Sequence, residues 1–164
     1  MEPLDTSAVL QPVVQWGPSA AGGGAYWAYA SWYVSATHGS HFSPLIQIAA
    51  GDLVLGTNAR SADGTWRIAA TAQGRAPSVL TFAPVDSGAA WGTAYHVLEA
   101  YGVSTGCSAY PAAGSVNFTG VALEVGGSRV SPIPWELLVQ NAGCGERATA
   151  SARGDKVTIL FDTA

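Results

Sequence analysis

Glu99 is the carboxyl group best placed to do chemistry. It lies inside AYHVLEAYGV, far in sequence from any other carboxylate, and the alternation of an extended chain puts it on one face with Tyr95, Val97 and Tyr101. A carboxyl group among aromatic and apolar side chains loses solvation, which favours its neutral form, as a general acid or base requires. The alternative is an exposed glutamate on a solvent-facing surface.

Two amides interrupt the apolar run AVLQPVVQWG at residues 8 to 17. In an extended chain this run has one wholly apolar face, predicted to be core, formed by Leu10, Pro12, Val14 and Trp16. The opposite face carries Val9, Gln11, Val13 and Gln15. This second face is either solvent-exposed or the floor of a groove.

The other acidic residues have structural explanations. Seven lie near the termini or beside turn residues, where a short carboxylate bonds the local backbone: Glu2, Asp5, Asp52, Asp63, Asp86, Asp155 and Asp162. Three more are expected to be solvated: Glu124, Glu136 and Glu146. The sequence has no Gly-x-Ser-x-Gly elbow and no glycine-rich phosphate loop. No metal site and no cofactor are predicted, because His38 and His41 have no acidic or cysteine partner nearby in sequence.

The aromatic run GAYWAYASWYVS, residues 24 to 35, has two faces with different predictions. Tyr26 and Trp32 share a parity with two alanines and are predicted to be core. The other face carries Trp27, Tyr29, Ser31 and Tyr33. An aromatic face of this kind is normally covered or bound to a ligand.

Nearly every segment has a period of two and ends at a Gly, Pro or Asp-Gly turn signal, as in LIQIAAGDLVLGTNAR followed by the Asp63-Gly64 turn. Short strands at this spacing predict an all-β sandwich or barrel. The length of 164 residues predicts one domain over 1–164, with residues 1–7 as a flexible N-terminal tail.

The composition argues against two classes of partner. A net charge of −4 with scattered arginines gives no basic stripe, so nucleic acid is not expected. No segment approaches the roughly 20 apolar residues of a membrane span. The start, MEPLDTSAVL, lacks the features of a signal peptide, yet few charges and many Ser, Thr, Gly and Trp residues favour a secreted protein. Cys107 and Cys144 form either one disulfide or two buried free thiols.

Five motifs, in order and with similar spacing, resemble those of the glutamic peptidases (eqolisins): VLQPVVQW, AYWAYASWYV, FSPLIQIAAGD, AYHVLEAY and GSVNFTGVALEVGGSRV. The corresponding family motifs read roughly ILQTGxDW, YDAWYEWYP, FSxIxISxGD, AEWIVEDFE and a GxVxFT strand. The resemblance runs from about residue 9 to the C-terminus.

This resemblance implies an antiparallel β-sandwich of two packed sheets, concanavalin-like or jelly-roll-like, with a polypeptide substrate lying in a concave groove. It implies that Gln11 and Glu99 are the catalytic dyad of an acid-acting endopeptidase. Glu99 would activate a water molecule and later protonate the leaving amine, and Gln11 would stabilise the oxyanion. The substrate-binding residues would be Gln15, Trp27, Tyr29, Ser31, Tyr33 and Tyr95.

The chain departs from the family pattern at four acidic positions, where it has Gln15, Trp27, Ser31 and Ala100. The family's leading strand segment also has no counterpart, so a homodimer or an N-terminal partner segment is expected to complete the sheet. Two other readings stay open: a non-catalytic module that binds peptide or glycan on the aromatic face, and a structural sandwich without a ligand.

Overall fold

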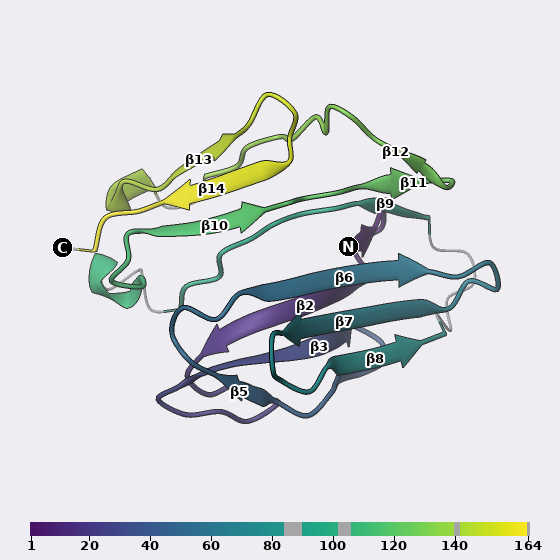
Figure 1. The fold of residues 1–164 in the computed structure, drawn as a ribbon, viewed down its shortest axis with the longest axis horizontal. Coiled ribbons are helices and arrows are strands. Elements are labelled where there is room, and N and C mark those ends of the chain that lie inside the picture. Colours follow the sequence, from purple (N-terminus) through teal and green to yellow (C-terminus); the bar gives the residue numbers. More distant parts are fainter. Residues whose placement is uncertain (84–89, 102–105, 140–141, 164) are drawn as a thin grey trace. The chain divides into compact units, whose positions relative to one another are not determined.

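The computed structural model describes residues 1–83, 90–101, 106–139 and 142–163. It divides into two compact units, Met1–Tyr95 and His96–Ala164 (Figure 1). The regular structure of the described residues consists of β-strands and two 3-10 turns, so the all-β prediction is confirmed. No helix among the described residues is long and apolar enough to cross a membrane. Whether the two units act as one domain stays a prediction.

The first sheet of unit 1 is built around a central strand. β2 (Ala8–Trp16) pairs antiparallel with β3 (Trp27–Ser35) along its whole length. The other edge of β3 is shared by β4 (Gly39–Phe42) and β5 (Ile46–Ile48). The aromatic and β-branched residues of these segments favour strands, and Pro12 is tolerated because β2 lies at an edge of this sheet.

A second antiparallel sheet consists of β6 (Val54–Arg60), β7 (Trp66–Ala72) and β8 (Ser78–Phe82). The predicted turn at Asp63 joins β6 to β7, and the Asp63 carboxylate accepts hydrogen bonds from Thr65 N at 2.9 Å and Ser61 Oγ at 2.7 Å. These bonds lower the pKa of Asp63. Its predicted structural role is therefore confirmed.

The two sheets of unit 1 pack face to face, with β6, β7 and β8 forming a layer over β2 and β3 (Figure 1). One core cluster joins Leu10 and Tyr33 to Trp66 and Ile68, and Tyr33 stacks on Phe82 at 3.7 Å. A second cluster contains Tyr29, Ile48, Ala70 and Ala72. Unit 1 is thus a β-sandwich, as predicted.

Gly56 in β6 allows the two layers to approach closely. A Cβ atom at this position would lie 2.7 Å from Pro12 Cγ in β2. Any larger residue would force β6 away from β2, so glycine is required here for packing.

The predicted flexible tail is instead part of the fold. β1 (Glu2–Pro3) pairs with β9 (Trp91–Thr93), and Pro3 is fully buried. The Met1 amino group donates to Leu10 O at 2.9 Å. The prediction for residues 1–7 was wrong because it considered only the local sequence and not pairing with residues ninety positions away.

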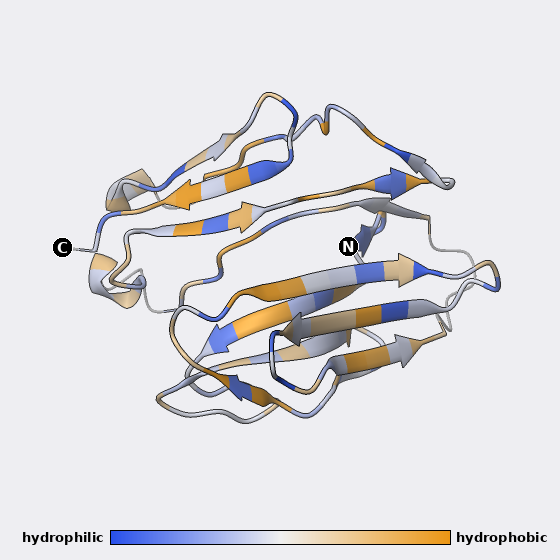
Figure 2. Ribbon diagram, in the orientation of Figure 1, coloured by the Kyte–Doolittle hydropathy of each residue, from blue (hydrophilic) through white to orange (hydrophobic). Residues whose placement is uncertain are grey.

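Unit 2 contains a sheet of β10 (Ser115–Thr119), β14 (Lys156–Leu160) and β13 (Arg147–Ala150), and a hairpin of β11 (Glu124–Val125) and β12 (Ser128–Arg129). Apolar and polar residues alternate along β10 and β14 (Figure 2). The core consists of Tyr110, Cys144, Ile159 and Phe161.

A disulfide joins Cys107 in η2 (Cys107–Ala109) to Cys144 in η3 (Ala142–Cys144). The alternative of two free thiols is therefore excluded. The described residues 134–139 form no ladder. Residues 94–100 also lie outside any strand.

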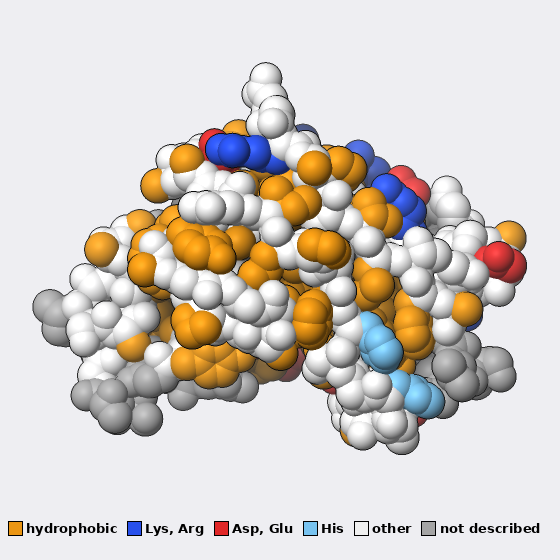
Figure 3. All heavy atoms as spheres, turned by 90° about the horizontal axis from the view of Figure 1, so that it is seen from below, with side chains coloured by type: hydrophobic (Ala, Val, Ile, Leu, Met, Phe, Trp, Pro, Cys, Tyr) orange, Lys and Arg blue, Asp and Glu red, His pale blue; other side chains and the backbone are white. Residues whose placement is uncertain are grey.

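The face of the molecule in Figure 3 shows many hydrophobic side chains and few charged ones. This agrees with the 11% charged residues of the sequence. Ion pairs between described residues are limited to two exposed or half-exposed ones, Arg75–Asp52 and Arg153–Asp155.

Candidate functional site

Strand register decides which side chains accompany Gln11. Gln11 lies directly opposite Trp32 in the β2–β3 ladder, and directly opposite residues of an antiparallel pair share a face. The neighbouring pair, Leu10 and Tyr33, points the other way, into the sandwich core. Gln11 therefore faces away from the second sheet of unit 1.

The Gln11 amide stands at the end of a row that continues through Trp32 and Phe42. The Trp32 and Phe42 rings lie 4.9 Å apart, and Trp32 is buried, as predicted. Gln11 is half-buried, and no side-chain hydrogen bond joins its amide to any described residue.

The predicted core face of β2 is only partly correct. Leu10 is fully buried, whereas Val14 is 46% exposed and Trp16 is 58% exposed. Trp16 contacts Trp27 at 5.4 Å, at the far end of β2 from Leu10. The interior of the sandwich covers only the Leu10 end of this face.

Gln15 does not have the free amide expected of a substrate-binding residue. Its Nε2 donates to Gly17 O at 2.9 Å and to Gly22 O at 3.2 Å, and its Oε1 accepts from Ser19 Oγ at 3.0 Å. Both ends of the amide thus hold the loop after β2. The prediction is corrected: Gln15 has a structural role.

Tyr29, Ser31 and Tyr33 were also predicted to bind substrate, and the structure buries all three. They lie on the face of β3 that packs against β7 and β8, and the Tyr29 hydroxyl donates to Ala76 O at 2.6 Å. The parity of the aromatic run was therefore assigned to the wrong side. β3 has most of its residues buried on both faces, so alternation alone could not separate core from surface.

Ser31 belongs to a buried hydroxyl network. Ser78 Oγ donates to Ser31 Oγ at 3.0 Å and lies 2.6 Å from Ser43 Oγ. Ser31 Oγ in turn donates to Ser78 O at 3.2 Å. This network joins β3 to β8, and its hydroxyls satisfy one another without solvent.

The other two predicted contact residues are more accessible. Trp27 is half-buried and lies on the same face as Tyr29, opposite to the face of Gln11. Tyr95 is 40% exposed. Nothing in unit 1 brings Trp27 to the Gln11 amide, so its predicted role beside the dyad is not supported.

Glu99 is exposed, and the burial expected for it is not found within its unit. Tyr101, which is 86% exposed, donates its hydroxyl to Glu99 Oε2 at 3.0 Å. This bond and the carboxylate charge raise the pKa of Tyr101. Sequence reasoning placed Tyr101 on this face and missed its role as a donor, although spacing of two residues in an extended chain allows the contact.

The residues that alternate with Tyr95, Val97, Glu99 and Tyr101 point inward, so the alternation predicted for this segment is confirmed. Leu98 and Ala100 pack against the core of unit 2. His96 packs between Phe118 at 4.5 Å and Trp135 at 5.2 Å, and burial lowers its pKa. His96 is half-buried and Glu99 is exposed, so the two side chains lie on opposite faces of this segment.

Gln11 belongs to unit 1 and Glu99 to unit 2, so their pairing stays a prediction. Among the described residues, no group of three His, Cys, Asp or Glu side chains could hold a metal ion. Asp52 accepts a hydrogen bond from Ala49 N at 3.0 Å, in line with its predicted turn role, whereas Asp86 lies outside the described residues.

Comparisons with known proteins point to one fold. No protein-family model and no curated protein sequence matches the chain. In structure, the chain is similar to the aspergilloglutamic peptidase from Aspergillus niger, with a TM-score of 0.66 and 21% identity. The match covers 95% of this chain and 91% of the peptidase chain. The chain therefore has a glutamic peptidase-like fold.

Proposed function

We propose that this protein is an endopeptidase that hydrolyses peptide bonds with a Glu99–Gln11 dyad and acts in acid. The observation that carries the proposal is the fold likeness to a glutamic peptidase over nearly the whole chain. It is supported by the motif order, which assigns the dyad to these two residues. The free Gln11 amide and the exposed Glu99 carboxylate are both compatible with contact to a substrate.

The dyad supplies the two functions that amide hydrolysis needs. The Glu99 carboxylate accepts a proton from water as the water oxygen attacks the scissile carbonyl carbon. The Gln11 amide N–H donates a hydrogen bond to the developing oxyanion, and a neutral donor is sufficient for this task. Glu99 then gives the proton to the leaving nitrogen, the C–N bond breaks, and the products are a carboxylic acid and an amine.

The second part of the proposal concerns the acidic pH and the extracellular compartment in which the protein would act. The two ion pairs between described residues are at least partly exposed, so protonating their carboxylates in acid removes little stability. The Cys107–Cys144 disulfide is typical of an oxidising compartment, which supports secretion.

The alternative of a binding module loses its main support. It relied on an exposed aromatic face of β3, and Tyr29 and Tyr33 are buried in the sandwich core.

A homodimer or a partner segment that completes the sheet stays a prediction, which the mass in solution by light scattering would test.

Cleavage of a denatured protein substrate between pH 2 and pH 7 tests the proposed function. We expect Glu99→Gln and Gln11→Leu each to lower the rate by at least about 100-fold, the usual size of a lost acid–base or oxyanion contribution. Glu136→Gln is the matched control, because it makes the same change at another exposed glutamate of unit 2. Equal cleavage by the wild type and Glu99→Gln would end the proposal.

A further inference from the structure

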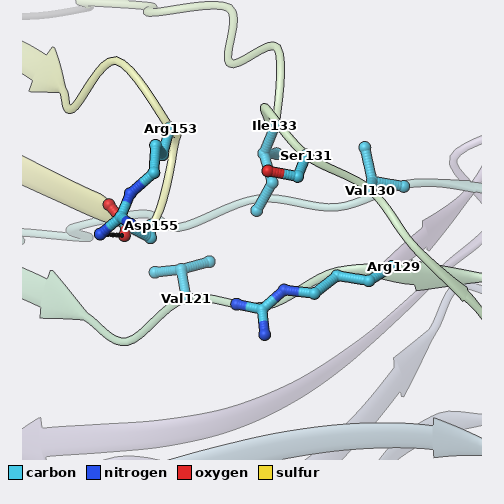
Figure 4. Close-up of a pocket in the computed structure, with 7 residues that line it drawn as sticks. All are labelled: Val121, Arg129, Val130, Ser131, Ile133, Arg153 and Asp155. Carbon is cyan, nitrogen blue, oxygen red and sulfur yellow. Dashed lines mark ion pairs between the residues drawn. The ribbon is translucent and has the colours of Figure 1, made fainter.

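Unit 2 contains an open cavity of about 330 Å³, at the lower end of the range for small-molecule sites (Figure 4). It lies between Val121, two residues after β10, the end of β12 with the segment that follows it, and the turn between β13 and β14. We call it the arginine pocket, defined by Val121, Arg129, Val130, Ser131, Ile133, Arg153 and Asp155. None of these residues belongs to the proposed dyad.

Backbone hydrogen bonds hold the walls of the arginine pocket together. Val121 N donates to Asp155 O at 2.9 Å, and Ile133 N donates to Arg153 O at 3.1 Å. Gly154 has a positive φ of 73°, and a Cβ atom there would lie 2.5 Å from Ile133 O. The cavity is therefore framed by fixed backbone and not by side chains alone.

The two arginines of the pocket differ in their partners. Arg153 forms an ion pair with Asp155 at 2.7 Å. Arg129 lies opposite Glu124 in the β11–β12 hairpin, yet among the described residues no ion pair to its guanidinium is found. Its guanidinium instead extends toward Val121 at the pocket (Figure 4).

The balance of charge in the pocket is positive. Asp155 is ionised near neutral pH, because the Ser151 hydroxyl and then Arg153 hold its pKa below the usual value. Two guanidinium groups and one carboxylate leave one uncompensated positive charge. Val121, Val130 and Ile133 add an apolar wall beside it.

We propose that the arginine pocket binds a carboxylate carried on a short aliphatic chain, such as an acidic side chain or the C-terminus of a peptide. The planar guanidinium of Arg129 donates two parallel N–H bonds to the carboxylate. The aliphatic chain packs on the three apolar residues. This site is additional to the proposed hydrolysis, because it uses neither Gln11 nor Glu99.

Titration followed by ¹H–¹⁵N NMR at neutral pH tests this proposal. The probes are N-acetylglutamate amide, with a side-chain carboxylate, N-acetylalanine, with a terminal carboxylate, and neutral N-acetylglutamine amide. We expect saturable shifts at the Arg129 side chain and at Val121 and Val130 with at least one carboxylate, and none with the neutral probe. The probe that binds more tightly shows whether the pocket prefers an acidic side chain or a peptide C-terminus.

Three variants make the test specific. Arg129→Gln should weaken binding at least tenfold, whereas Arg147→Gln, which changes an exposed arginine of β13 outside the pocket, should leave it unchanged. Asp155→Asn frees Arg153 and should tighten binding severalfold. Binding that is unchanged in Arg129→Gln, lost equally in Arg147→Gln, or absent for both carboxylates would overturn the proposal, whether or not the protein cleaves peptides.

Discussion

Removing the Cys107–Cys144 bond should strongly destabilise unit 2. The two cysteines are 37 residues apart in sequence, so the bond closes a long loop in the unfolded chain. The loop-closure relation gives an entropy of about 13 cal/mol/K for a loop of this length, or about 4 kcal/mol at 25 °C. We therefore expect Cys107→Ala/Cys144→Ala to lose about 4 kcal/mol of unfolding free energy. Cys144 is also buried against Tyr110 and Phe161, so its truncation adds to the loss.

Equilibrium unfolding in urea measures this loss. With a slope of about 2 kcal/mol/M, the midpoint should fall by about 2 M. The wild type with its disulfide chemically reduced is the control, since it breaks the same bond without removing a sulfur atom, and it should show most of the shift. An unchanged midpoint in both samples would refute the reasoning, because it would mean that the bond does not restrict the unfolded chain.

Four further predictions concern single side chains. Leu10→Ala should cost about 2–5 kcal/mol in urea unfolding because Leu10 is fully buried, whereas Val14→Ala on the same strand face should cost less than about 1 kcal/mol; similar losses would contradict the observed burial. Tyr29→Phe should cost about 1 kcal/mol by the same measurement, since it removes the hydrogen bond that the buried Tyr29 hydroxyl donates to the carbonyl of Ala76. Gln15→Ala should leave the core intact but make the loop after β2 sensitive to limited proteolysis, and an unchanged cleavage rate would refute its structural role. Burial lowers the pKa of His96. The stability that its neutral ring contributes is therefore present above the unfolded-state pKa of about 6.5 and is lost as the pH falls through the folded-state pKa. The thermal unfolding temperature of His96→Phe should accordingly depend less on pH between 7 and 4 than that of the wild type.

The sequence was informative about architecture because turn residues and alternation are local signals. The Asp63-Gly64 turn and the strands on either side of it were predicted from a few neighbouring residues, and the structure confirms them. The sequence could not decide between a disulfide and two free thiols, because the bond forms only if the fold brings η2 and η3 together. The pairing of residues 2–3 with β9 is equally non-local.

The faces of β3 could not be predicted in the same way. Gln11 lies on the outward face of β2, as the alternation predicted. The residue of β3 on the same face is Trp32, whereas Tyr29 and Tyr33 lie on the opposite face. A shift of one residue in register exchanges the two faces of a strand, and the loop between β2 and β3 sets that register. The arginine pocket was missed because its arginines come from segments that only the fold brings together.

The serine network between β3 and β8 limits how this chain could evolve. Ser31 occupies the position where the resembling family carries a glutamate, and here it is enclosed by Ser43 and Ser78 with no access to water. A glutamate introduced at this site would bring a longer side chain and a negative charge into a space that fits one hydroxyl group, at a cost of several kcal/mol. A glutamate at this position is therefore not accessible by a single mutation, because the side chain at position 31 would first have to leave the interior of the sandwich.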